Sequence, residues 1–136
     1  MPTTKGRTIE ENNKNIKNKI GCCKNKYLKG VKGDKEDTHY VYITKVNKDG
    51  TCRVNTITSL EKDGNFIEKR IAHIKKGNIY PIPIGDTNLS HWSGVTKTPI
   101  DNVKISHIQG IGNRYIKKRH WFYIGKTFNG KKTQKK

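Results

Sequence analysis

The sequence predicts a mostly β protein: a small barrel with a short N-terminal helix and basic termini. Short segments rich in β-branched and aromatic residues alternate with turn signals, which is typical of small barrels. The chain has 136 residues, of which 31% are hydrophobic, so it can build one modest core. We expect a basic extension containing the helix over residues 1–35, the β domain over 36–128 and a basic disordered tail over 129–136.

The N-terminal helix is expected from a capping signal. Thr8 followed by Glu11 fits a capping box and predicts a short polar helix over residues 9–20. Its few apolar residues make this helix marginal on its own. A loop rich in glycine and charge follows over residues 29–37.

The middle of the chain predicts a β-hairpin followed by shorter strands. Residues 39–46 and 51–60 have strand composition, and Asn47-Lys48-Asp49-Gly50 between them is a hairpin turn signal. Two prolines make residues 79–84 an edge strand, because proline cannot donate to a β-ladder. The remaining expected elements are a turn at 62–65, a strand at 66–74, a loop at 85–93, and strands at 103–108 and 120–128.

Positive charge is concentrated at the two ends of the chain. The net charge is +18, divided as +7 over residues 1–35, +2 over 36–113 and +9 over 114–136. Polyanions are the natural partners of such a field. A membrane-surface protein would need an amphipathic helix with bulky apolar residues, which the helix candidate lacks. We therefore expect a nucleic acid, most simply RNA, as the partner.

Targeting and cysteine usage indicate a cytoplasmic protein without a membrane segment. No apolar run approaches the ~20 residues needed to span a bilayer. The N-terminus has no apolar signal region, and three cysteines are an odd count without disulfide-framework spacing.

No metal or cofactor is expected. Cys22 and Cys23 are adjacent rather than spaced as zinc ligands, and the five histidines show no ligand spacing. Gly110-Ile111-Gly112-Asn113 lacks the third glycine of a dinucleotide loop and is interpreted as a plain turn.

Residues 114–123, near the C-terminus, interleave cations with aromatic rings, as proteins that hold single-stranded nucleic acid do. If the run is a strand, alternation puts Trp121 and Tyr123 on one face and His120, Phe122 and Ile124 on the other, and one of these faces must be core. The expected RNA-binding residues of this run are Arg114, Lys117, Lys118, Arg119, Trp121 and Tyr123.

The hairpin brings a histidine beside two hydroxyl residues. A three-residue loop would place His39 opposite Ser59 and Tyr40 opposite Thr58, and a two-residue loop would shift the pairing by one. His39 with Thr58 or Ser59 could transfer protons on RNA, whose 2′-OH is an internal nucleophile. Arg53 lies about 20 Å along the strand from Ser59, so it could hold only a flanking phosphate. A β-bulge would change which of these residues share a face.

Several segments together resemble the MazF/PemK/Kid toxins. They are Tyr40-Val41-Tyr42-Ile43, Val54-Asn55-Thr56-Ile57-Thr58-Ser59, Ile79-Tyr80-Pro81-Ile82-Pro83, Asn88-Leu89-Ser90-His91-Trp92-Ser93-Gly94-Val95-Thr96 and Ile100-Asp101-Asn102-Val103-Lys104-Ile105. The resemblance covers residues 39–108. It implies an SH3-like barrel and a homodimeric endoribonuclease toxin of a toxin–antitoxin system. It further implies selective, metal-independent cleavage of single-stranded mRNA through 2′-OH attack, and neutralisation by a small acidic antitoxin.

The chain departs from this family at the first strand. His39 and Tyr40 stand where the family carries an Arg-Pro pair, and Thr58 or Ser59 matches its conserved hydroxyl residue. Either His39 performs the arginine's role, or the chain is a non-catalytic SH3-like nucleic-acid-binding accessory protein of a plasmid or phage.

Overall fold

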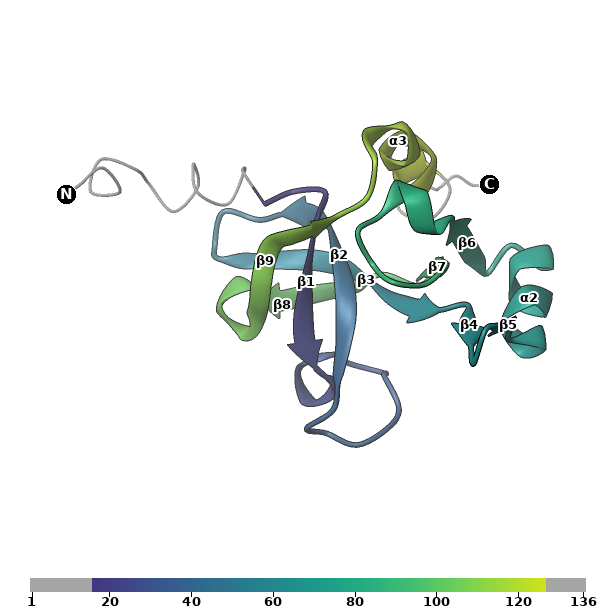
Figure 1. Cartoon of the computed structure of the whole chain (residues 1–136). Coiled ribbons are helices and arrows are strands. Elements are labelled where there is room, and N and C mark those ends of the chain that lie inside the picture. Colours follow the sequence, from purple (N-terminus) through teal and green to yellow (C-terminus); the bar gives the residue numbers. More distant parts are fainter. Residues whose placement is uncertain (1–15, 127–136) are drawn as a thin grey trace.

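The computed structural model describes residues 16–126, except for the side chain of Asn113, and shows a mostly β protein. Within these residues an antiparallel sheet of seven strands curls into a half-barrel, with two short helices, α2 and α3, beside it (Figure 1). The elements are β1 (Lys19–Lys24), β2 (Thr38–Val46), β3 (Thr51–Ser59), β4 (Glu61–Lys62), β5 (Asn65–Phe66), α2 (Glu68–Lys75), β6 (Ile79–Ile82), β7 (Ser93–Thr96), β8 (Ile100–Lys104), β9 (Ile108–Tyr115) and α3 (Trp121–Ile124). Four 3₁₀ turns complete them: η2 (Asn25–Tyr27), η3 (Ile84–Asp86), η4 (Ile105–His107) and η5 (Lys118–His120).

Strand β3 divides the sheet, whose order is β6-β7-β3-β2-β1-β9. Along one edge it pairs with β2, whereas its other edge pairs first with β8 and then with β7. The change of partner lies between Val54, which faces Ile100, and Ile57, which faces Val95. Because two different strands continue the sheet from one edge of β3, the sheet curls instead of remaining flat. The strand 79–84 predicted at an edge is β6, which ends the sheet.

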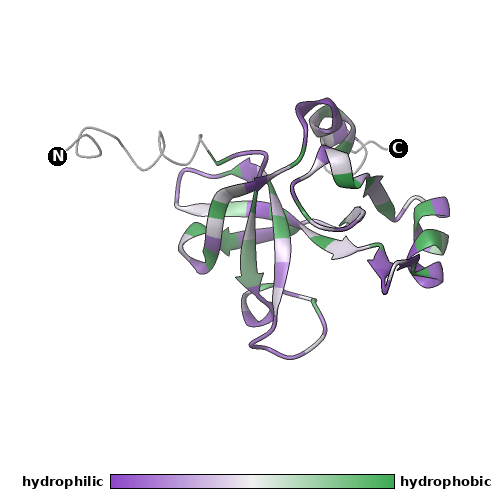
Figure 2. Ribbon diagram, in the orientation of Figure 1, coloured by the Kyte–Doolittle hydropathy of each residue, from purple (hydrophilic) through white to green (hydrophobic). Residues whose placement is uncertain are grey.

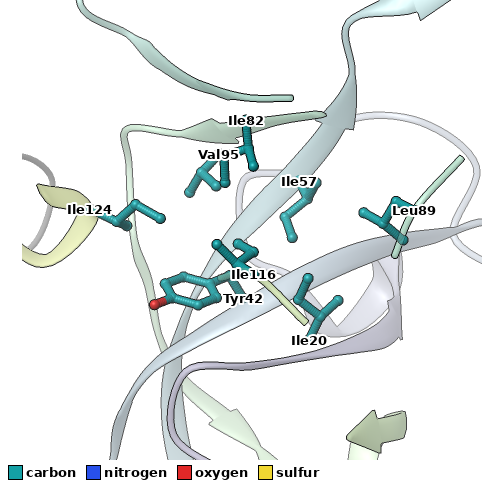
Figure 3. Close-up of a cluster of buried hydrophobic side chains, with 8 residues drawn as sticks. All are labelled: Ile20, Tyr42, Ile57, Ile82, Leu89, Val95, Ile116 and Ile124. Atoms are coloured by element: carbon teal, nitrogen blue, oxygen red, sulfur yellow. The ribbon is translucent and has the colours of Figure 1, made fainter. Parts of the chain in front are cut away.

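Each face of the sheet buries one apolar cluster, as strand alternation requires. The first cluster contains Ile20, Tyr42, Ile57, Ile82, Leu89, Val95, Ile116 and Ile124 (Figure 3). The second contains Cys23, Leu28, Val41, Ile43, Cys52, Val54, Val103 and Ile108. Hydrophobic positions recur along the central strands, whereas the loop joining β1 to β2 is mostly hydrophilic (Figure 2).

A bulge at Thr44 sets the register of the central hairpin. Near the turn Val46 faces Cys52, but beyond the bulge Tyr40 faces Ile57, one residue from the predicted partner Thr58. The pairings expected for a three-residue loop, Tyr40 with Thr58 and His39 with Ser59, were therefore wrong, and this end of the hairpin follows the alternative register shifted by one residue. The extra residue in β2 moves Tyr40 onto the face of Ile57 and moves His39 onto the opposite face.

The predicted helix over residues 9–20 is not present where the structure can test it. Residues 16–18 form a turn in which Asn18 has φ +70°, and β1 begins at Lys19. Ile20 is fully buried between β2 and β9, so sheet pairing outweighs a weak helical preference. Residues 9–15 of that prediction and the tail 129–136 lie outside the described residues.

The strand predicted at 66–74 was wrong. Phe66 closes the two-residue pairing of β4 with β5, and the helix α2 follows. Ile67, Ile71 and Ile74 recur with helical rather than strand spacing, a period that the sequence reading missed.

The strand predicted at 120–128 was also wrong within the described residues. Its start is the turn η5 and the helix α3, where Ile124 is buried and the indole Nε1 of Trp121 donates to the carbonyl of Ile116 at 2.8 Å. The strands β1, β7 and β9 and the two-residue strands β4 and β5 escaped prediction, and the strand predicted at 103–108 was wrong, since those residues form the end of β8, the turn η4 and the start of β9. Gly110 and Gly112, expected in a plain turn, lie within β9 with positive φ. Across residues 16–126 the structure contains no helix long and apolar enough to cross a membrane.

Candidate functional site

A cavity of about 260 Å³ lies where β3 ends beside β7. We call it the Thr58 cavity, and its polar lining includes Tyr40, Thr58, Ser59, His91 and Arg114. These residues come from three separate strands and the loop before β7. The fold thus brings together Thr58, Ser59 and Arg114, which the sequence had assigned to catalysis and to RNA binding.

The two hydroxyl residues of the cavity, Thr58 and Ser59, differ in their hydrogen bonding. Ser59 Oγ donates to the carbonyl oxygen of Glu61 at 2.7 Å and accepts from the Glu61 backbone N–H at 3.2 Å. Thr58 faces Gly94 on β7, and its hydroxyl has no hydrogen-bond partner among the described residues. Thr58 therefore has the hydroxyl without a partner, although alternation along β3 puts its side chain on the face of His39 and puts Ser59 on the face of Ile57 and Tyr40.

Arg114 provides the cation of the cavity. It lies on β9, and its guanidinium carbon is 4.8 Å from the centre of the Tyr40 ring. No carboxylate of the described chain forms an ion pair with it. Stacking orders the planar guanidinium while leaving N–H donors at its edge, an arrangement suited to phosphate.

His91 is the imidazole that lines this cavity. Its Nδ1 lies 3.4 Å from Glu61 Oε1, which also accepts from the Trp92 backbone N–H at 3.1 Å. Neither His91 nor Tyr40 was among the site residues predicted from the sequence. Both lie in segments used for the family resemblance, which was the available signal.

His39 lies on the opposite face of β2 from the Thr58 cavity. The β2–β3 register, extended by one residue, places it opposite Thr58 on that face. Its Nδ1 is 2.6 Å from Asn25 Oδ1, and the Asn25 amide nitrogen donates to the carbonyl of Asp34 at 2.9 Å. Asn25 therefore presents an oxygen, so His39 Nδ1 is the donor and Nε2 keeps its lone pair.

The surroundings of His39 favour its neutral form. Burial is the main cause that lowers the pKa of His39, and nearby Arg70 lowers it further, against a smaller opposing effect of Asp37. Arg70 also donates to the carbonyl oxygen of Ser59 at 2.6 Å. Arg70 is thus a second cation near the end of β3 that the sequence analysis missed, because the segment was expected to be a strand.

The remaining predicted RNA-binding residues lie away from the Thr58 cavity. Arg53 and Trp121 line a second cavity, near the start of β3. Lys117 and Arg119 contact the buried carboxylate of Asp86, whose pKa the hydrogen bonds from Arg119 and His120 lower to about 2. Lys118 and Tyr123, both exposed, complete the set.

No group of three or more His, Cys, Asp or Glu side chains within residues 16–126 is placed to hold a metal ion. Comparison of the chain with protein-family models finds no match, and neither does comparison with curated proteins.

Proposed function

We propose that this protein is an SH3-like-barrel endoribonuclease that cleaves single-stranded RNA at the Thr58 cavity. The observation that carries the proposal is the meeting of Arg114 from β9 and Thr58 from β3 beside Tyr40. A cation and a free hydroxyl can hold the two non-bridging oxygens of a phosphodiester.

The reaction needs no group beyond the RNA and the protein. The ribose 2′-oxygen attacks the adjacent phosphorus, the bond from phosphorus to the 5′-oxygen breaks, and a 2′,3′-cyclic phosphate and a 5′-hydroxyl form. Arg114 and Thr58 would stabilise the negative charge that develops on the phosphate oxygens. This makes Thr58, rather than Ser59, the catalytic hydroxyl, since the Ser59 hydroxyl is bonded to Glu61.

Proton transfer is assigned to His91, because this imidazole lines the cavity. His39 is the competing candidate. Its Nε2 is a free base, and it lies opposite Thr58 on the face of the sheet away from Tyr40. Separate His91→Ala and His39→Ala variants distinguish the two, because the variant that lacks the proton-transfer group loses cleavage while retaining RNA binding.

The biological setting proposed is that of a toxin. An enzyme that cleaves mRNA must be inhibited when it is not needed, and an acidic partner segment bound to the basic surface of this +18 protein would inhibit it. The toxin proposal also includes a homodimer. A monomer by light scattering, without a small acidic protein encoded beside it, would count against this setting.

A specific observation supports a second candidate, a non-catalytic nucleic-acid-binding protein. Of the three residues assigned to catalysis, Ser59 is engaged with Glu61 and His39 lies outside the cavity. The Thr58 cavity could then hold a phosphate without breaking a bond.

One assay separates the two functions. The purified protein is incubated with long single-stranded RNA in EDTA, and the product ends are analysed. Cyclic phosphate ends that disappear in Thr58→Val, which keeps the side-chain shape without the hydroxyl, support cleavage at the cavity. A salt-sensitive gel shift with intact RNA supports the binding protein.

A further inference from the structure

A second, larger cavity of about 500 Å³ lies between the start of β3, the end of β2 and α3. We call it the Tyr42 cavity. Its lining is Lys17, Asn18, Tyr42, Thr44, Lys45, Arg53, Trp121, Phe122 and Gly125. None of the interactions proposed for cleavage uses it.

The charges of this cavity suit a phosphate. Three cations line it, Lys17, Lys45 and Arg53, and no carboxylate does. Both lysines are exposed, and neither forms an ion pair with a carboxylate in the part of the chain that the structure describes. Arg53 holds Asp101 at 2.7 Å. The lysines can therefore meet an anion without breaking an existing ion pair.

Two aromatic side chains, Trp121 and Phe122, line one side of the cavity. Trp121 packs against the first apolar cluster, and its indole N–H is bonded to the carbonyl of Ile116, so the ring cannot turn freely. Phe122 beside it is 67% exposed, with Lys126 Nζ 5.6 Å from its ring centre. An exposed ring beside a fixed one is a surface on which a flat base can stack.

Hydrogen-bonding groups are also in place. The Tyr42 hydroxyl donates to Asn18 Oδ1 at 2.7 Å, which orients the Asn18 amide and leaves its nitrogen as a donor. Asn18 is held by its own backbone N–H, which donates to the carbonyl of Ile43 at 2.7 Å. The cavity thus offers an oriented amide donor as well as cations and rings.

One basic segment connects the two cavities. Arg114 lines the Thr58 cavity and Trp121 lines the Tyr42 cavity, while the segment between them carries Lys117, Lys118 and Arg119. The first apolar cluster contributes Leu89 to the Thr58 cavity and Tyr42 to the Tyr42 cavity, and Leu89 and Ile124 lie at opposite sides of it (Figure 3). The distance along β3 from Arg53 to Ser59 is about 20 Å. A single strand following the basic segment from one cavity reaches the other after a few nucleotides.

We propose that the Tyr42 cavity binds one nucleotide of single-stranded RNA that flanks the cleaved bond. The base stacks against Trp121 and Phe122, and Lys17 and Lys45 hold its phosphate. The identity of this strand as a substrate rests on the proposed cleavage function. The binding itself does not, and it can be tested with RNA that cannot be cleaved.

The test uses a short fluorescent RNA with 2′-O-methyl riboses, whose binding is followed by anisotropy at several salt concentrations. Phe122→Ala should weaken binding about fivefold to 100-fold, because one base loses its stacking surface. Lys45→Ala should reduce the log–log salt slope by about 0.7, since one phosphate contact is lost. The matched controls Phe66→Ala and Lys75→Ala, at exposed positions outside both cavities, should stay within about twofold of wild type.

Wild-type affinity and salt slope in both cavity variants would overturn the inference. So would variants that lose affinity for poly-glutamate but not for RNA, because the cavity would then serve an acidic protein segment. If unmodified RNA is not cut but Phe122→Ala still weakens binding, the cavity assignment stands and the cleavage proposal falls.

Discussion

Replacing Arg114 tests whether the cation of the Thr58 cavity acts on RNA or only supports the fold. Its described interaction is the stacking of the guanidinium on Tyr40, 4.8 Å from the ring centre. It forms no ion pair with a described carboxylate, so Arg114→Ala leaves no buried charge behind. The loss of the cation–π contact should lower the free energy of unfolding by at most about 1 kcal/mol.

The effect on cleavage should be much larger. Removal of one charged donor from a site of developing negative charge costs about 10²–10³-fold in rate. Arg114→Lys keeps the charge but loses the planar stacking on Tyr40, so its rate should lie between wild type and Arg114→Ala. Single-turnover cleavage of a labelled single-stranded RNA gives the rates, and urea unfolding gives the stabilities.

Two results would refute this reasoning. A rate for Arg114→Ala close to wild type would remove Arg114 from the site. A rate loss accompanied by an equally large loss of unfolding free energy would show a structural role only. Lys104→Ala, which removes an exposed cation on β8, is the control for the change in net charge.

Three further predictions follow from single contacts. The pKa of His39 is lower in the folded state than in the unfolded state, so the free energy of unfolding should decline as pH falls below about 6.5. His39→Gln should flatten that decline in urea unfolding, and an unchanged pH profile would contradict the lowered pKa. Gly94→Ala should destabilise by about 1–3 kcal/mol, because the added Cβ would overlap Ile79 Cγ2, whereas Gly85→Ala, with open space around it, is the matched control. The lowered pKa of Asp86 means that the stabilising effect of its carboxylate is lost as pH falls from 3.8 to about 2. The difference in unfolding free energy between wild type and Asp86→Asn should therefore shrink over that interval, and a constant difference would contradict the role of the Asp86 charge.

Local patterns predicted the centre of the fold well. The residues of β2 and β3 have β-branched and aromatic composition and a turn signal between them, and both strands appear as expected. The prolines placed β6 at an edge, also as observed. These features depend on neighbours in sequence, which is why a single sequence contains them.

Elements that depend on distant partners were missed. β1 is strand because Ile20 is buried between Tyr42 and Arg114, and nothing within residues 9–20 announces that burial. The segment 120–128 has aromatic residues that suit a strand. Trp121 instead bonds back to Ile116 and the chain turns into α3.

The site was predicted in part for the same reason. Thr58 could be chosen from the hairpin and Arg114 from the basic run, but their meeting required the path of β9 across the sheet. The bulge at Thr44 decided which neighbour faces the cavity, and it put Tyr40 there instead of His39. A single extra residue in a strand leaves little trace in the sequence, although it reverses both faces beyond it.

Asp86 fixes the position of the basic segment between Arg114 and Trp121. Asp86 is only 4% exposed, and its carboxylate receives Arg119 and His120 while its backbone carbonyl accepts from the Lys117 N–H at 2.9 Å. These contacts fix the middle of the segment that carries Arg114 to one cavity and Trp121 to the other. A basic tail without such contacts would bind a polyanion with no fixed spacing between its cations and the phosphates. A basic segment held at its centre keeps its two ends at a fixed separation, which is what the proposed binding of one RNA strand at both cavities requires.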